Sequence, residues 1–281
     1  MDFEVYKRII DEVVEWEPIP SITLSYEGES ILNQNINEYL KYLGIQNIRP
    51  WISTRQLSDD EDVLKCLLQF CGAISVSMDE NVDYSQKKHN TDAIRNKLKK
   101  RFFNLTKLAQ KDYPETSLSV SMILHLPQDI ESLLVKNFIA EWMDHVHEIY
   151  LWQKIDFTNG LKYYYKNGIE RHLRRRRVCD QPFSYLAVLS DGRISPCCNT
   201  SRVIQRSINV SNGLLNAINS EEYQKFLERH RSLDLQDTPC EDCELWLDSW
   251  LGDEMFNISL EDGRQCQVFC EGSSCRIEGK L

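Results

Sequence analysis

Two hydrophobic patterns alternate along the first half of the chain. Apolar residues recur at helical spacing over residues 3–15, 31–43, 59–70, 91–112 and 129–146. Short apolar runs typical of buried strands follow them, at residues 21–26, 48–53, 73–78, 117–124 and 148–153. This alternation predicts an α/β fold with a parallel sheet and crossover helices on its outside. The pattern gives five strands, and it begins with a helix that has no strand before it.

Beyond residue 155 the pattern changes to aromatic and basic segments, then short strands, then a cysteine-rich tail. Asp191-Gly192 stands between two apolar runs in FSYLAVLSDGRISPCC, which is the strongest local signal for a tight hairpin turn. We therefore expect an α/β domain over residues 1–160, a linker over 161–178, and a small α+β domain over 179–281.

Composition narrows the class of protein. The 281 residues are 42% hydrophobic, which is enough to bury one large core or two smaller ones. A net charge of -10 argues against a general affinity for nucleic acid or anionic membranes. The basic run RHLRRRR at 171–177 is the exception, and it is either a solvated connector or a phosphate contact. No apolar stretch reaches the roughly 18 residues of a membrane span, so we expect a cytoplasmic protein.

Ten cysteines are many for a reducing compartment, where clustered cysteines ligate metal more often than they form disulfides. Cys179 precedes the hairpin and Cys197 follows it, so the turn at Gly192 brings the two ends together. Cys240 and Cys243 form a C-x-x-C knuckle whose thiolates can face one centre. These four thiolates are a closed ligand set suited to zinc or to an iron-sulfur cluster, and their spacing does not choose between the two.

Other cysteines have different expected roles. Cys66 and Cys71, on a helical face and at its end, are expected to be isolated core thiols. Cys198, next to a predicted ligand, packs beside the site or tunes it. Cys266, Cys270 and Cys275 in the tail are candidates for a second metal centre, alone or with Cys198.

The set Cys179, Gly192, Cys197, Cys240 and Cys243 resembles the motif of the SPASM or twitch domain that follows the barrel in many radical SAM enzymes. The segment that contains Asn209 is similar to the strand that precedes the knuckle in that domain. Ser249 stands where a full SPASM motif has its next cysteine, so the single-cluster twitch form fits better. Alternatively, the tail cysteines are the remaining SPASM ligands, displaced by an insertion.

The first half resembles the radical SAM barrel. YEGES at 26–30 is similar to the glycine-glycine-glutamate-proline motif that contacts the amino group of S-adenosylmethionine, which implies that Gly28 and Glu29 bind the cofactor. WIST at 51–54 and SVSMDE at 75–80 are similar to two further strand ends of the family, which adds Ser53 and Ser77. The alternative is that these side chains only cap strand ends and helix starts.

One defining motif of the family does not occur. Radical SAM chemistry needs a C-x-x-x-C-x-x-C loop after the first strand, and the 281 residues contain no such triplet. An incomplete (β/α)6 partial TIM barrel that lacks its first strand would account for both this absence and the five predicted strands. We therefore expect a truncated or N-terminally incomplete radical SAM enzyme that is inactive as it stands.

The resemblance implies the cofactors and partners. An auxiliary 4Fe-4S cluster would be bound by Cys179, Cys197, Cys240 and Cys243. S-adenosylmethionine and a second 4Fe-4S cluster would bind only if the missing loop were supplied. The complete enzyme would cleave S-adenosylmethionine and abstract hydrogen from a peptide or small molecule, with an electron-donor protein as a further partner. The alternative is a non-catalytic iron-sulfur or zinc module for peptide recognition or electron transfer.

Overall fold

A computed structural model describes residues 1–26, 28–78, 91–124, 127–153, 177–197, 204, 208–241, 243, 254–271 and 274–281. The chain divides into two compact units, each assembled from two separate segments. Met1–Pro20 and Ile155–Asp248 form what we call the cysteine unit, and Ser21–Lys154 and Ser249–Leu281 form what we call the sheet unit. Cys198, the run 171–176 and nearly all of the expected linker lie outside the described residues.

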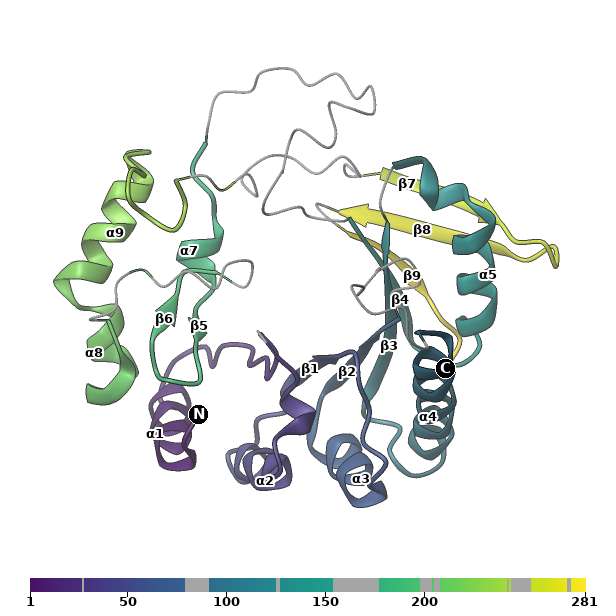
Figure 1. The fold of residues 1–281 in the computed structure, drawn as a ribbon, viewed down its shortest axis with the longest axis horizontal. Helices are drawn as coiled ribbons and strands as arrows, with labels where there is room; N and C mark the ends of the chain where they lie inside the picture. Colours follow the sequence, from purple (N-terminus) through teal and green to yellow (C-terminus); the bar gives the residue numbers. More distant parts are fainter. Residues whose placement is uncertain are drawn as a thin grey trace. The chain divides into compact units, whose positions relative to one another are not determined.

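A seven-stranded sheet in the order β1-β2-β3-β4-β9-β8-β7 is the centre of the sheet unit (Figure 1). Its parallel half consists of β1 (Trp51–Thr54), β2 (Ala73–Ser77), β3 (Ser117–Leu124) and β4 (Glu148–Gln153). Four of the five predicted parallel strands are thereby confirmed. The fifth, at residues 21–26, is reduced to a single parallel bridge between Thr23 and Trp51.

The antiparallel half of this sheet comes from the tail of the chain. β9 (Ser274–Glu278) pairs with β4, β8 (Gln265–Glu271) pairs with β9, and β7 (Glu254–Ser259) pairs with β8. The expectation that residues 179–281 form one cysteine-rich domain is therefore wrong for the tail. Its strands alternate buried and exposed positions, as β8 does with Cys266, Val268 and Cys270 buried, and their apolar face completes the core of the sheet unit.

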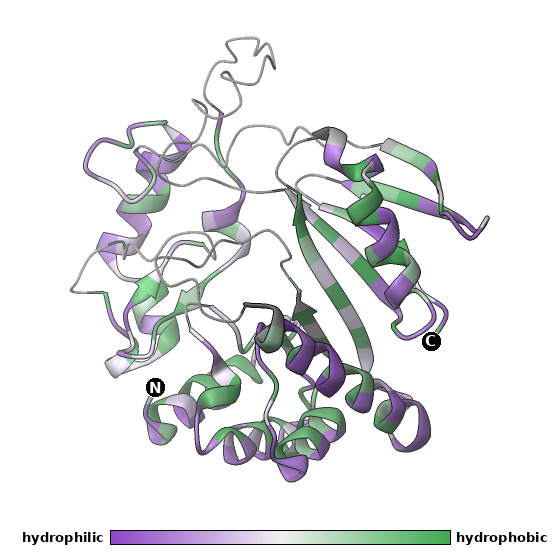
Figure 2. Cartoon of the chain, turned by 45° about the vertical axis from the view of Figure 1, so that its right-hand side comes forward, coloured by the Kyte–Doolittle hydropathy of each residue, from purple (hydrophilic) through white to green (hydrophobic). Residues whose placement is uncertain are grey.

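Four helices lie along one side of the sheet (Figure 1): α2 (Ile36–Ile45), α3 (Glu61–Phe70), α4 (Thr91–Asp112) and α5 (Leu133–Trp142). The 3-10 helices η1 (Ser30–Leu32) and η2 (Pro127–Glu131) precede α2 and α5. Side chains cap the N-termini of α3 and α5. Asp60 accepts a hydrogen bond from the Asp62 N–H, and Ser132 accepts one from the Val135 N–H. The helices each carry a hydrophobic and a polar side, and the strands alternate along their length (Figure 2).

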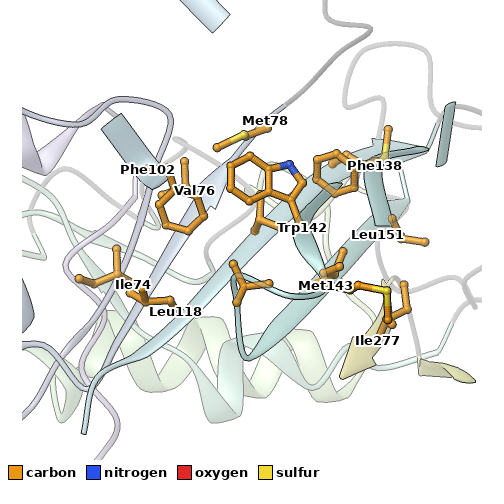
Figure 3. Close-up of a cluster of buried hydrophobic side chains, with 14 of the residues drawn as sticks. Ile74, Val76, Met78, Phe102, Leu118, Phe138, Trp142, Met143, Leu151 and Ile277 are labelled. Atoms are coloured by element: carbon orange, nitrogen blue, oxygen red, sulfur yellow. The ribbon is translucent and has the colours of Figure 1, made fainter. Parts of the chain in front are cut away.

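The core lies between these helices and the alternate strand residues that face them (Figure 3). Trp142 of α5 is fully buried, with its ring 4.5 Å from that of Phe103 and 5.2 Å from that of Phe102, both on α4. Phe138 and Met78 lie beside it in the same cluster. Burying large side chains of this kind contributes roughly 1.5–3 kcal/mol each, so this packing fixes the strands whose ends carry the candidate cofactor residues.

The cysteine unit contains short elements around a hairpin: α1 (Phe3–Val13), α7 (Gln181–Ser184), β5 (Ala187–Val188), β6 (Ile194–Ser195), η3 (Val210–Asn212), α8 (Leu214–Ile218) and α9 (Glu221–Arg231). α1 is the first helix predicted from the sequence, but it packs here on α8 and η3 rather than in the sheet unit. None of the helices in the described ranges is long and apolar enough to span a membrane.

Candidate metal centre and cofactor site

The predicted hairpin is present in front of Cys197. β5 and β6 pair antiparallel, with Ala187 opposite Ser195 and Val188 opposite Ile194. The turn between them closes with a hydrogen bond from the Gly192 N–H to the Leu189 carbonyl. Cys197 follows two residues after β6 and is buried, while Cys179 is half-buried. The sequence-predicted turn therefore leads directly to one of the four candidate ligands.

Gly192 meets a geometric requirement at this turn. Its φ is +83°, a conformation that L-residues with a side chain rarely adopt. A Cβ built on Gly192 would lie 2.9 Å from Asn209 Oδ1 and 3.1 Å from Asn209 Nδ2. Asn209 Nδ2 donates to the Asp191 carbonyl at 2.9 Å, and the Val210 N–H donates to the Gly192 carbonyl at 2.9 Å. Glycine is thus needed both for the turn and for the close approach of Asn209.

The C-x-x-C knuckle folds as a tight turn. The Cys243 N–H donates to the Cys240 carbonyl at 3.3 Å, and the Cys240 N–H donates to Thr238 Oγ1 at 3.2 Å. Cys240 is buried and Cys243 is half-buried. Within the described ranges, no group of three or more His, Cys, Asp or Glu side chains is close enough to hold a metal ion. The convergence of the four thiolates on one centre therefore stays a prediction.

The tail cysteines lie elsewhere. Cys270 and Cys275 are opposite each other on β8 and β9 and form a disulfide, with their Cα atoms 4.0 Å apart. Cys266 is 4% exposed in the core of the sheet unit. Two of the three thiols are thus bonded to each other, and all three belong to the sheet unit. The hypothesis that these three cysteines bind a second metal centre or complete the SPASM ligands is therefore wrong in this structure. The expectation that clustered cysteines ligate metal rather than form disulfides is also wrong for Cys270 and Cys275.

Cys66 and Cys71 are core cysteines that form no disulfide, as predicted. Both are buried, and burial raises the pKa of each thiol, that of Cys71 to about 12. A thiol of this kind stays protonated near neutral pH and is a poor metal ligand.

Gly28 and Glu29 lie at the end of β1. Gly28 has a φ of +95°, and no atom lies within 4 Å of a Cβ built on it. The Glu29 carboxylate accepts hydrogen bonds from Thr54 Oγ1 at 2.5 Å and from the Arg55 N–H at 3.1 Å. These hydrogen bonds to Thr54 and Arg55 cap the end of a strand, which is the alternative role stated in the sequence analysis. They also fix the Glu29 carboxylate at the carboxyl end of a parallel strand, where α/β proteins bind their ligands.

Ser53 and Ser77 belong to rows of serines on the sheet. The register places Ser53 beside Ser75 and Ser75 beside Ser119 on neighbouring strands. In the next row, the hydroxyls of Ser77 and Ser121 are 3.2 Å apart. These positions alternate with the core residues of the same strands, so they share the opposite face of the sheet. The serines at every second position of β3 were a visible signal for this face that the sequence interpretation missed.

The same face continues into charged and aromatic side chains on β4 and β9. Tyr150 Oη donates to Glu148 Oε2 at 2.8 Å, and Arg276 Nη1 donates to Glu148 Oε1 at 3.0 Å. Burial, followed by the bond to Glu148, raises the pKa of Tyr150 to about 12. Tyr150 therefore remains a protonated donor at physiological pH. Sequence reasoning could not find this cluster, because it depends on the tail strand pairing with β4.

A comparison with protein families identifies the region that contains the hairpin and the knuckle. Residues 179–244 match the model of the SPASM family, which is described as an iron-sulfur cluster-binding domain. Residues 179–244 are thus similar to a SPASM domain. All four candidate ligands lie inside the matched range, and Cys266, Cys270 and Cys275 lie outside it. A search of curated proteins found no match.

Solved structures share the fold. SuiB of Streptococcus suis bound to precursor peptide SuiA matches with a TM-score of 0.52 and 14% identity, over 86% of this chain and 63% of that chain. SuiB bound to S-adenosylmethionine matches with a TM-score of 0.50 and 14% identity, over 88% and 64% of the two chains. BtrN in an open conformation matches with a TM-score of 0.46 and 13% identity, over 87% and 80%. This chain therefore spans less than two thirds of SuiB.

The domain match confirms the resemblance of residues 179–244 to a SPASM domain, and the solved structures show a shared mixed α/β fold. The donor set also fits an iron-sulfur cluster, because thiolates are its usual protein ligands and two of the four thiols here are buried. The residues do not fit the cluster that cleaves S-adenosylmethionine, because the three-cysteine motif that would bind it does not occur in these 281 residues.

Proposed function

We propose that Cys179, Cys197, Cys240 and Cys243 bind an auxiliary 4Fe-4S cluster. The observation that carries this proposal is the match of residues 179–244 to an iron-sulfur cluster-binding domain. The hairpin that leads to Cys197 and the turn at Cys240 support it. When bound by all four thiolates, such a cluster would supply one-electron transfer. The single-cluster twitch form remains our choice, because two tail thiols are joined in a disulfide.

We propose that the sheet unit is an incomplete partial barrel that contributes to radical SAM chemistry on a peptide or small-molecule substrate. In this proposal Gly28, Glu29, Ser53 and Ser77 contact S-adenosylmethionine, supported by their position at the carboxyl ends of neighbouring strands. The peptide bound to SuiB in one compared structure supports a peptide among the substrate classes. The three-cysteine loop would have to be supplied from outside these 281 residues, so the chain alone would not start the reaction.

Anaerobic reconstitution of the full chain with iron and sulfide tests the cluster assignment. We expect about four iron and four sulfide per chain and a brown visible absorbance. Cys197→Ala and Cys240→Ala should each lose most of that iron. Cys71→Ala is the matched control, because Cys71 is also buried but lies in the sheet unit. One colourless zinc per chain, or equal iron loss in the control, would contradict the assignment.

An assay for 5'-deoxyadenosine tests the statement about activity. The reconstituted chain, given reductant and S-adenosylmethionine, should form none beyond a trace. Many turnovers of product from the purified chain would overturn the claim that the chain cannot start the reaction alone.

The absence of the three-cysteine motif favours a second candidate, a non-catalytic iron-sulfur module for peptide recognition or electron transfer. This candidate shares the cluster but needs no S-adenosylmethionine site. The discriminating measurement supplies a C-x-x-x-C-x-x-C peptide during reconstitution and then titrates S-adenosylmethionine. Binding under these conditions, weakened by Ser77→Ala, would favour the incomplete enzyme. No measurable binding, together with an intact auxiliary cluster, would favour the module.

A further inference from the structure

α1 lies far in sequence from the hairpin and the knuckle, yet it belongs to the same compact unit. Its apolar stripe of Tyr6, Ile9, Ile10 and Val13 is buried. On the same helix, Arg8 is exposed and Glu12 is half-buried. Both side chains bond to backbone atoms more than two hundred residues later in the chain: each pair is 203 residues apart.

Glu12 caps the start of α8. Its Oε2 accepts a hydrogen bond from the Leu215 N–H at 2.9 Å. Gly213, at the N-cap position of α8, has no side chain to cap the helix itself. A Cβ on Gly213 would lie 2.8 Å from Glu12 Oε1, so the glycine leaves the space that the carboxylate uses. The Glu12 side chain therefore replaces the missing local cap.

Arg8 holds the residues just before this helix. Arg8 Nη1 donates to the Ser211 carbonyl at 3.1 Å. Ser211 in turn donates its N–H to Asn209 Oδ1 at 2.8 Å. Asn209 is the residue that contacts the hairpin, since its Nδ2 donates to the Asp191 carbonyl at 2.9 Å. A continuous series of hydrogen bonds thus runs from α1 to the turn of the hairpin.

We propose that Glu12 and Arg8 are positioning residues for the iron-sulfur centre. They act through residues 209–215. Asn209 and Val210 of this segment hydrogen-bond to the turn at Asp191 and Gly192, and that turn determines where Cys197 lies. This inference rests on the proposed function, because it needs a cluster at the SPASM cysteines. It gives the first helix of the chain a role in the metal centre, although that helix contains no metal ligand.

The test compares cluster properties in variants of the full chain after anaerobic reconstitution. Glu12→Ala removes the cap, and Glu12→Gln keeps a neutral acceptor of nearly the same shape. Glu15→Gln is the matched control, because Glu15 is an exposed carboxylate near the end of the same helix. The readouts are the rate of iron release to a chelator, the reduction potential and the electron paramagnetic resonance spectrum of the reduced cluster.

We expect Glu12→Ala to release iron about tenfold faster, which is the size expected for losing a hydrogen bond to a charged group. Glu12→Gln should be intermediate, Glu15→Gln should match wild type, and the spectrum or potential should shift in Glu12→Ala. In the Asn209→Ala background the Glu12→Ala change should have a smaller effect, because both residues act through the segment 209–215.

Three outcomes would each overturn the inference alone. The first is a wild-type spectrum, potential and iron release in Glu12→Ala, and the second is additive effects with Asn209→Ala. A lower unfolding temperature of the metal-free Glu12→Ala chain, with unchanged cluster properties, would also overturn it, since a merely structural role predicts that result. A wild-type chain that binds no iron would overturn the proposed function as well, so the two failures are distinguishable.

Discussion

Gly192→Ala tests whether the turn before Cys197 depends on Asn209. An alanine at φ +83° carries a steric cost of about 1–2 kcal/mol, less about 0.4–1 kcal/mol gained by restricting the unfolded chain. The new methyl group would also displace the Asn209 side chain, since a Cβ would lie 2.9 Å from its Oδ1. Losing the Asn209 hydrogen bonds to Asp191 and Ser211 adds about 1 kcal/mol each. The expected total is about 2–3.5 kcal/mol.

Gly263→Ala is a matched control for this change. Gly263 has a φ of +85°, but no atom lies within 4 Å of a Cβ built on it, so only the backbone cost applies. Hydrogen exchange measured by mass spectrometry reports local opening at each turn. We expect amides at 187–195 to exchange roughly 30- to 400-fold faster in Gly192→Ala. Amides around Gly263 should exchange less than about 15-fold faster in Gly263→Ala.

A double variant separates the two causes. With Asn209→Ala already present, adding Gly192→Ala should cost only about as much as Gly263→Ala, because the contact is gone. If Gly192→Ala and Gly263→Ala accelerate exchange equally, or if Asn209→Ala gives no relief, the proposed role of the Asn209 contact is refuted.

Three further results are expected in the sheet unit. Trp142→Ala should lower the free energy of unfolding by about 3–5 kcal/mol, because it empties the centre of the core; a loss below about 1 kcal/mol in urea titrations followed by circular dichroism would contradict this. Tyr150 has its pKa raised from 10.0 to about 12, so the folded chain keeps a proton that the unfolded chain loses. Stability should therefore fall as pH rises from about 10 to 12, and Tyr150→Phe should flatten that decline; parallel curves for the two proteins would count against it. Iodoacetamide at pH 8 should leave Cys71 unmodified in the native chain, since burial raises the pKa of its thiol to about 12; rapid native labelling in peptide maps would be inconsistent with this burial.

The sequence predicts the local elements well because their signals are local. The helix expected at 91–112 is α4 with the same bounds, and β3 matches its predicted range. The strand expected at 21–26 is only a bridge, because its apolar run does not say whether a neighbouring strand pairs along its whole length. The placement of α1 was missed for a similar reason: its apolar stripe shows that it packs, but not against which partner.

The tail contains features that the sequence predicts and others that only the structure reveals. Period-two alternation in QCQVFCE and the Asp262-Gly263 turn were readable signals for a hairpin. The position of that hairpin beside β4 was not readable, since pairing across more than a hundred residues depends on the whole fold. The Glu148, Tyr150 and Arg276 cluster follows from that pairing. In contrast, the four candidate cysteines were proposed from their spacing in the sequence, and all four lie inside the range that matches the SPASM model.

The pairing of β4 with β9 has a consequence for how the protein is made. Roughly 120 residues separate the two strands along the chain, so one edge of β4 stays open until β9 has been translated. At about 5–20 residues per second, the ribosome leaves this edge exposed for on the order of ten seconds. An open strand edge invites pairing with other chains. A stop codon just before β9 should therefore yield mostly aggregate in cells, even though such a chain would retain every SPASM cysteine.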